Sequence, residues 1–383
     1  MKWPRAPLLM CSSSSRTGAV EGLIALGREL RAQAIDARFA GDTVRPGENL
    51  GEHLAAAGVP WEQQLRLSRK VRLADVLHDV QQLARGPYDL LHAAMAHDHL
   101  VALLAAFWRP GLRVVRAVQR RIDVEPGRFG KRLWALRRSD GVLVHCESYR
   151  TLLLRHLPAE RVACVPGSVD AQVFTPGCAP GLRARWGIPL DAPLAGVVAR
   201  MKPERGQRVA LAGFAQALRE VPSAFLVLVG RGEDEEALRA QVRDLAIADR
   251  VVFGGYQRGP ALLQAYRALD VAVWLREGND GACRGVLEAM ACGLPVVAGS
   301  EGAPGELVRD GIDGRVVDPA DPAAIGRALA ELLRDRERAQ ALGRAARERA
   351  EGFTPAQAAA QTLAFWRRIG SLPPARALAA LPR

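Results

Sequence analysis

The sequence predicts an α/β protein built from two Rossmann-like, doubly wound domains. Short apolar strands alternate with longer helical patterns, which is typical of stacked βαβ units. A stretch rich in proline and glycine, residues 174–194, interrupts this alternation and marks a boundary. A length of 383 residues is also more than one hydrophobic core supports. We therefore expect one domain over 1–175 and a second over 176–354, facing each other across a cleft at the carboxyl ends of their strands.

The N-terminal domain begins with a buried strand at residues 7–10, because the apolar piece before Cys11 is too short for a signal-peptide core. A serine-rich loop follows, and then an amphipathic helix at 19–34. Further strands are predicted at 88–92, 112–118, 141–145 and 162–165, with helices at 100–107 and 147–157.

A second series of the same units forms the C-terminal domain. Its predicted strands lie at 194–199, 224–229, 251–253, 271–275 and 295–298, with helices at 207–220, 234–245, 260–269 and 285–292. Thr354 and Pro355 then start a last helix, expected within about 355–383. It can pack back on the first domain or stay on the second.

Charge and cysteine content narrow the classes of function. The formal net charge is +12, and ten Lys or Arg between residues 109 and 138 face only Asp123 and Glu125. This segment is either a solvated face or a contact for an anionic partner such as a lipid surface or a phosphorylated glycan. No nucleic-acid module accompanies it, and we expect no nucleic-acid partner. Six scattered cysteines without a C-x-x-C pair favour a reducing cytoplasm.

The most informative segment runs from Asp280 to Ala298, a loop that feeds a helix between two strands. The backbone N–H groups at such a helix start, here Gly281, Ala282, Cys283 and Arg284, form an anion site suited to a diphosphate. Glu288, about one turn further, can accept hydrogen bonds from the two hydroxyls of a ribose. Asp280, or Glu277 in its place, can do the same for a hexose.

Two cations follow the first strand of the second domain. Arg200 and Arg205 stand five positions apart and can neutralise a leaving nucleoside diphosphate. Their alternative role is a surface salt bridge with Glu204. The glycine turn that includes Gly230 follows the next strand.

These residues together resemble the retaining family-4 glycosyltransferases of the GT-B fold, similar to members that build lipopolysaccharide and other surface glycans. Asp280 and Glu288 match the family's E-x7-E signature, with Asp in the first position, and the match extends to Glu306. Arg200 and Arg205 match its Arg-x4-Lys element, with Arg in place of Lys. The resemblance implies a nucleotide-sugar donor, retention of anomeric configuration, and no cofactor or metal.

The acceptor side is predicted in the N-terminal domain. Ser15, Arg16, Thr17 and Gly18 follow the first strand, where they would line the cleft. The serine loop at 12–15 can equally be only a flexible turn. His97 is either an active-site residue or a histidine of the helix start or the core, and the same holds for His99. Gln119 stands where the family often has a histidine, and an amide cannot carry a proton.

We accordingly expect a cytoplasmic hexosyltransferase that takes a nucleotide-sugar and a glycan or lipid-linked acceptor, in surface polysaccharide or lipopolysaccharide synthesis. The basic N-terminal domain can give it peripheral contact with an anionic membrane at the inner face of the cytoplasmic membrane. Two alternatives stay open: a catalytically weakened nucleotide-sugar-binding protein, and a sugar-nucleotide epimerase of the same fold.

Overall fold

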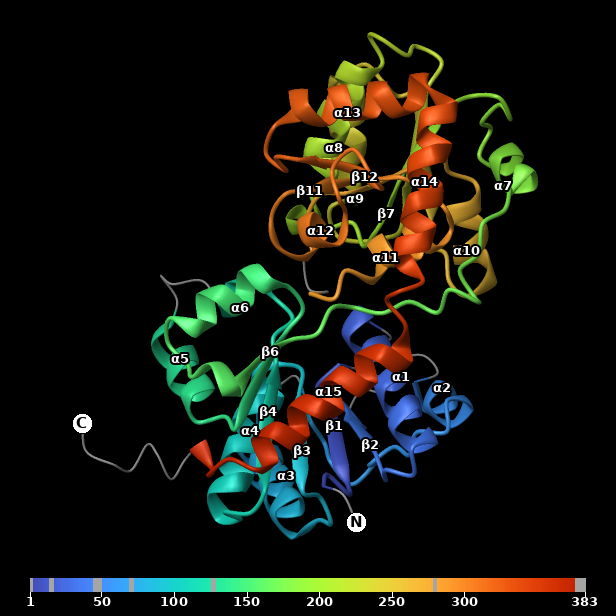
Figure 1. Ribbon diagram of the computed structural model, residues 1–383. Coiled ribbons are helices and arrows are strands. Elements are labelled where there is room, and N and C mark those ends of the chain that lie inside the picture. The colour runs from blue at the N-terminus through green and yellow to red at the C-terminus, as the bar shows by residue number, and fades with distance from the viewer. Residues whose placement is uncertain are drawn as a thin grey trace. The chain divides into compact units, whose positions relative to one another are not determined.

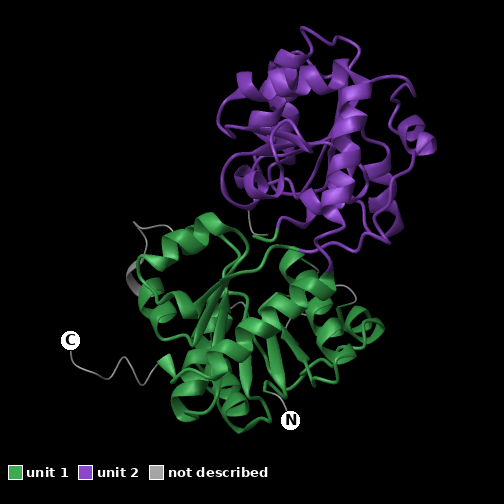
Figure 2. Cartoon of the chain, in the orientation of Figure 1, with its two compact units in different colours: residues 1–167, 279–282, 355–383 green, residues 168–278, 283–354 purple. Residues whose placement is uncertain are grey.

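The computed structural model divides the chain into two compact units (Figure 2). Unit 1 holds residues 1–167, 279–282 and 355–383, and unit 2 holds 168–278 and 283–354. The residues that the structure describes are 3–13, 17–43, 50–68, 72–124, 129–277 and 281–375, with only the backbone for 129–131.

Unit 1 is built on a parallel sheet that has six strands among the described residues (Figure 1). The spatial order is β2-β1-β3-β4-β5-β6, so the chain starts near one edge and crosses over to the other. The strands are β1 (Pro7–Cys11), β2 (Arg38–Gly41), β3 (Leu90–Ala93), β4 (Arg113–Ala117), β5 (Gly141–Val144) and β6 (Val162–Cys164).

Helices cover both faces of this sheet because alternate strand residues point to opposite sides. Leu9 of β1 packs with the helix that follows it and with the C-terminal helix, whereas Leu8 and Met10 pack on the other face. The helices are α1 (Gly18–Ala32), α2 (Leu50–Ala56), α3 (Leu73–Arg85), α4 (Ala96–Trp108), α5 (Phe129–Arg137), α6 (Glu147–Leu154) and α15 (Pro355–Gly370), with short 3-10 turns η1 (Arg121–Asp123) and η3 (Ala159–Arg161).

The C-terminal helix α15 belongs to unit 1, although it follows the whole of unit 2 in sequence (Figure 1). It packs against α1. Its Leu363, Phe365, Trp366 and Ile369 are buried in the core beneath the sheet. Unit 1 is therefore completed by a helix that follows unit 2 in the sequence.

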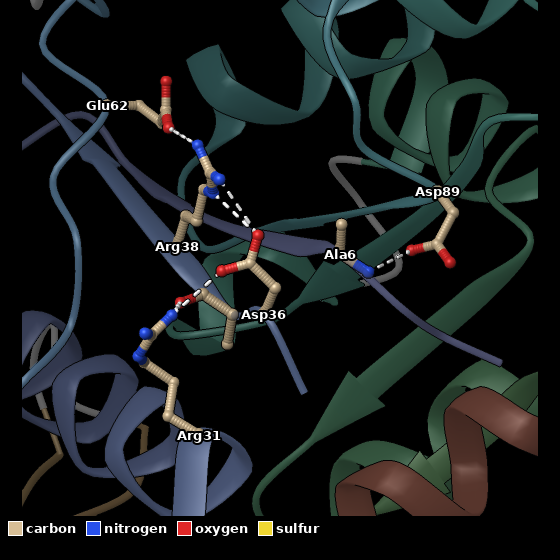
Figure 3. Close-up of polar contacts among 7 residues, drawn as sticks. Ala6, Arg31, Asp36, Arg38, Glu62 and Asp89 are labelled. Atoms are coloured by element: carbon tan, nitrogen blue, oxygen red, sulfur yellow. Dashed lines mark hydrogen bonds and ion pairs between the residues drawn. The ribbon is translucent and has the colours of Figure 1, made fainter. Parts of the chain in front are cut away.

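A charged network lies where the strands of unit 1 begin (Figure 3). Asp36 accepts from Arg31 at 2.9 Å and from Arg38 at 3.0 Å. Arg38 also donates to Glu62 at 2.8 Å. These pairs connect the turn after α1 to the start of β2. They lie at the amino-terminal ends of the strands, whereas ligands of this class of fold bind at the carboxyl ends.

Unit 2 repeats the architecture with a second parallel sheet, also of six strands in the part of the chain described, in the order β12-β11-β10-β7-β8-β9. Its strands are β7 (Leu194–Val198), β8 (Phe225–Val229), β9 (Val251–Gly255), β10 (Val271–Trp274), β11 (Val296–Gly299) and β12 (Gly314–Val317). Its helices are α7 (Pro180–Arg185), α8 (Gln207–Ala217), α9 (Glu235–Asp244), α10 (Pro260–Arg267), α11 (Arg284–Ala291), α12 (Gly302–Leu307), α13 (Pro322–Arg334) and α14 (Arg336–Ala350), with a 3-10 turn η4 (Pro203–Arg205). The prediction of two doubly wound α/β domains is confirmed.

Candidate functional site

Helix α11 carries Arg284 and Glu288, two of the residues predicted to bind the donor. Cys283 precedes it with a left-handed backbone, φ +47°, and the Cys283 side chain does not cap the first turn of the helix. Asp280, the residue predicted to contact the donor sugar, lies outside the described residues. Gly281 and Ala282 are grouped with unit 1 and not with α11. The backbone N–H groups at the start of α11, predicted to bind an anion, belong to unit 2.

Close packing on the neighbouring strand positions α11. A Cβ placed on Gly285 would come within 2.1 Å of the Trp274 ring, which lies at the end of β10. Only glycine allows this approach, so the sequence Arg284-Gly285 brings the helix start directly onto the strand end.

Glu288 is held at both carboxylate oxygens. It is only 6% exposed, and it accepts from the Tyr266 hydroxyl at 3.0 Å and from Arg284 Nη2 at 2.8 Å. Burial, together with the negative charge of Glu288, raises the pKa of Tyr266 well above its ordinary value, so the phenol stays a donor. The predicted ribose carboxylate therefore has a fixed geometry, with one donor at each of its two oxygens.

The two predicted cations take different positions. Arg200 follows β7 and is exposed, and no side-chain hydrogen bond or ion pair is recorded for it within the described ranges. Arg205 is half-buried and donates to the Glu277 backbone oxygen at 2.6 Å, with its guanidinium carbon 5.7 Å from the centre of the Trp274 ring. Both arginines follow the carboxyl end of β7, and Glu277 follows the carboxyl end of β10. Because β7 and β10 are neighbouring parallel strands, these residues lie at the same end of the sheet.

Glu204, the alternative partner of these arginines, lies instead 4.0 Å from Lys202. Glu277 is buried, with its carboxylate against Gly302 at the start of α12, as the 2.9 Å from an added Cβ shows. Glu277 therefore lies beside Arg205 at the end of β10.

Gly230 and Glu306 have different surroundings. A Cβ on Gly230 would lie 2.0 Å from the Ala199 oxygen, so this glycine lets the turn after β8 pack against the loop that carries Arg200. Glu306 lies on α12 with an exposed side chain, and its backbone oxygen accepts from Arg349 at 3.1 Å. Gly230 thus packs against the loop that carries Arg200.

In unit 1, the loop after β1 is tied to the start of α4. Ser15 and Arg16 lie outside the described residues. Thr17 caps α1 through its hydroxyl, which accepts from the Val20 N–H at 3.4 Å, and Gly18 is the first helical residue. The Ser12 N–H donates to both oxygens of the buried Asp98, at 2.9 and 3.1 Å.

His97 and His99 lie on α4 next to Asp98 and differ in environment. His97 is half-buried in the first turn. His99 points into the core, where its Nε2 is 2.6 Å from Ser139 Oγ, and burial with the nearby Arg116 lowers its pKa to about 3. A neutral, buried His99 has the environment of a core histidine, and only His97 keeps an accessible ring.

Gln119 follows β4 and is buried, at 5% exposure, and its Oε1 has no hydrogen-bond partner within the described part of the chain. Buried amide oxygens usually have one. Gln119 therefore offers a free acceptor at the carboxyl edge of the first sheet.

Three functional candidates were not predicted. Tyr266 donates a hydrogen bond to Glu288. Asp98 accepts from the Ser12 N–H in the loop after β1. Arg116 is buried on β4 and pairs with Asp123 at 3.1 Å. A charged residue within an apolar strand was the available signal for Arg116, whereas a tyrosine on an apolar helix face gives none.

Models of known protein families match both halves of the chain. Residues 16–173 match Glycosyltransferase Family 4, and residues 180–349 match Glycosyl transferases group 1. Each half of the chain is therefore similar to a glycosyltransferase family, the first half to family 4 and the second half to group 1.

Particular relatives are similar over part of their length. A D-inositol 3-phosphate glycosyltransferase of Acidothermus cellulolyticus is 36% identical over 45% of this chain and 41% of its own. A GDP-mannose-dependent alpha-(1-6)-phosphatidylinositol monomannoside mannosyltransferase of Mycolicibacterium smegmatis is 36% identical over 50% of this chain and 52% of its own. The chain thus spans about half the length of these curated relatives.

Among solved structures, Anabaena HepE in complex with UDP-glucose superposes with a TM-score of 0.80 and 21% identity, over 94% of this chain and 99% of HepE. This similarity shows the shared fold.

Proposed function

We propose that the protein transfers a sugar from a nucleotide-sugar donor to a glycan or lipid-linked acceptor, with retention of configuration. The observation that carries the proposal is the buried Glu288, fixed by Tyr266 and Arg284 at the start of α11, in the segment that matches glycosyl transferases group 1. The donor ribose would bind Glu288, and its diphosphate would bind the α11 start with Arg200 and Arg205. The sugar would lie near Asp280.

The acceptor would bind unit 1, with Thr17, His97 and Gln119 near the carboxyl ends of its strands. Relatives named for inositol phosphate and phosphatidylinositol mannosides favour a phosphate-bearing acceptor. The basic segment 109–138 suits such an anion. A role in lipopolysaccharide or another surface glycan remains part of this proposal, supported by the resemblance of the Asp280–Glu288 segment. A cytoplasmic location with peripheral membrane contact completes it.

Fixed cations would take the place of a metal ion in this reaction. Arg200 and Arg205 can neutralise the charge that develops on the departing nucleoside diphosphate. We therefore expect EDTA to leave the rate of transfer unchanged, and full loss of activity restored by Mg²⁺ would contradict this.

The test compares variants in thermal-shift and transfer assays against a panel of nucleotide sugars. Donor binding raises the melting temperature of the form that binds. Glu288→Ala and Arg200→Ala should each abolish or greatly reduce that rise, whereas Glu337→Ala and Arg219→Ala, exposed changes on α14 and after α8, should keep it.

Unchanged donor binding and transfer in both site variants would refute the proposal. Binding without turnover across many acceptors would instead identify a nucleotide-sugar-binding protein. Conversion of the donor in the absence of any acceptor would identify an epimerase.

A further inference from the structure

Exposed apolar side chains gather on one side of unit 1. Eleven large hydrophobic residues are exposed among those described, and seven of them lie on the three helices α3, α4 and α5. Helix α4 packs against both of the others. Figure 1 shows these helices in unit 1, in the blue-green part of the chain. Scattered exposed apolar residues are ordinary, but a concentration on neighbouring helices indicates an interaction surface.

Helix α4 exposes a continuous apolar stripe. Leu100, Leu104, Phe107 and Trp108 follow the spacing of one helix face, and the last two are 74% and 73% exposed. The opposite face, with Val101 and Ala105, is buried in the core of unit 1. The helix is therefore apolar on both sides, one packed inward and one facing out.

An exposed tryptophan and two arginines lie at the C-terminal end of α5 and directly after it. Trp134 is 51% exposed, and the guanidinium carbon of Arg138 lies 4.0 Å from the centre of its ring. Arg137 beside them is exposed. Aromatic rings with an adjacent arginine suit the boundary between hydrocarbon and lipid headgroups, because the ring enters the apolar layer while the cation stays with the phosphates.

A cavity of about 650 Å³ adjoins the stripe between α4 and α5. Leu100, Trp134 and Leu136 contribute its apolar wall. Its polar end holds Asp123, which is surrounded by Arg116 at 3.1 Å, Arg120 at 3.2 Å and Arg132 at 3.6 Å. Three guanidinium groups around one carboxylate leave an excess of positive charge, so an anionic headgroup is favoured there.

We propose that this face of unit 1, the α4 stripe with Trp134, Arg137 and Arg138, docks onto a bilayer that contains anionic phospholipid. Leu104, Phe107 and Trp108 enter the acyl boundary, the arginines contact the phosphates, and the cavity receives a hydrocarbon chain beside Leu100. The apolar stripe suits the hydrocarbon layer of a bilayer, and the arginines beside Trp134 suit the phosphates of anionic lipids. The docking rests on the proposed function only for its purpose, which is to bring unit 1 to a lipid-linked acceptor.

Vesicle co-sedimentation of the full chain tests the proposal. We expect binding to vesicles of phosphatidylcholine mixed with phosphatidylglycerol, weak binding to phosphatidylcholine alone, and loss of binding as salt rises. The Phe107→Ser/Trp108→Ser double variant should bind about tenfold more weakly or worse. Arg138→Glu should cost about fivefold or more.

Ile312→Ser is the matched control, because Ile312 is also an exposed large apolar residue but lies in unit 2. It should leave vesicle binding unchanged. Vesicles with brominated acyl chains should remove less tryptophan fluorescence from Trp108→Phe and Trp134→Phe than from the unchanged protein. The intensity that they remove from Trp186→Phe should equal that removed from the unchanged protein. Donor-induced thermal stabilisation, measured in every variant, reports on the proposed function separately and should be retained.

Failure to sediment with either vesicle, while nucleotide sugars still raise the melting temperature, would overturn the docking and leave the transferase proposal standing. Equal losses in Ile312→Ser would also overturn it. So would a concentration-dependent dimer that the double variant abolishes, because the face would then bind a second copy of the chain.

Discussion

The carboxylate of Glu288 owes its position in unit 2 to two side chains of opposite kind. Tyr266 is fully buried and provides a neutral donor, whereas Arg284 is part-exposed and provides a charged one. Only the exposed partner can move into solvent without leaving a buried polar group unpaired. We accordingly expect Tyr266 to act as a positioning residue, and Arg284 to be the partner that can move when a ligand binds.

Replacing Tyr266 by Phe removes the donor to Glu288 at 3.0 Å while keeping the ring. A hydrogen bond to a charged group contributes about 1.5–3 kcal/mol. We expect the KM for the nucleotide sugar to rise roughly tenfold or more with a smaller change in kcat. Tyr149→Phe is the control, since this buried hydroxyl has no recorded partner in the described residues. Equal kinetics in the two variants would contradict the positioning role.

Two buried histidines make the stability of unit 1 depend on pH. Burial lowers the pKa of both His92 and His99 to about 3, from 6.5. Protonation therefore favours the unfolded chain: the stabilisation is complete above about pH 6.5 and is lost as the pH falls towards 3. Each histidine contributes a slope of up to ~1.4 kcal/mol per pH unit in that window. Urea unfolding followed by tryptophan fluorescence should give a shallower pH dependence in His99→Gln, and an unchanged slope would refute the assignment.

At the scale of elements, the junction of β10 and α11 decides the geometry of the proposed donor site. The start of α11 reaches the strand end only because residue 285 has no side chain. Gly285→Ala would force a Cβ to 2.1 Å from the Trp274 ring, so the helix must shift. Overpacking of this kind costs about 1–3 kcal/mol.

We expect Gly285→Ala to lower both the melting temperature and donor affinity. Gly22→Ala on α1 is a matched change, because a Cβ there meets nothing within 4 Å. It should stabilise the protein by about 0.5–1 kcal/mol through helix propensity. A destabilised Gly22→Ala variant, or an unaffected Gly285→Ala variant, would show that local packing has been misjudged.

The sequence predicted most elements because hydrophobic periodicity within each βαβ unit is a local property. Strands β2 and β12 were missed: Arg38 and Arg315 place a charge in segments of only four residues, and pairing with β1 and β11 decides their structure. The Arg284–Glu288 pair could be read from its helical spacing. The contact of Glu288 with Tyr266 could not, since it joins residues 22 positions apart on different helices.

At the scale of the whole molecule, unit 1 is assembled from the two ends of the described chain. Arg113 donates to the Leu372 oxygen at 2.7 Å, and Arg161 donates to the Pro373 oxygen at 2.6 Å. These bonds join the segment after α15 to β4 and to η3. The C-terminal segment is thus fixed by both apolar burial and polar contacts.

Truncation after Thr354 should unfold unit 1 and leave unit 2 folded. It removes Phe365 and Trp366 from the core, and loss of one such aromatic side chain costs about 3–5 kcal/mol. Hydrogen exchange read by mass spectrometry should show rapid exchange in β1 and β4 and protection in β7 and β10. Continued protection of β4 would show that α15 is dispensable.

The return of α15 to unit 1 also reverses the usual order of maturation during translation. Domains generally fold as they emerge from the ribosome, with the N-terminal one first. Here the unit synthesised first lacks part of its apolar interior until α15 has left the ribosome, whereas the described strands of unit 2 all precede α15. A nascent chain with residues up to about 354 outside the ribosome should therefore carry a folded unit 2 and an incompletely folded unit 1.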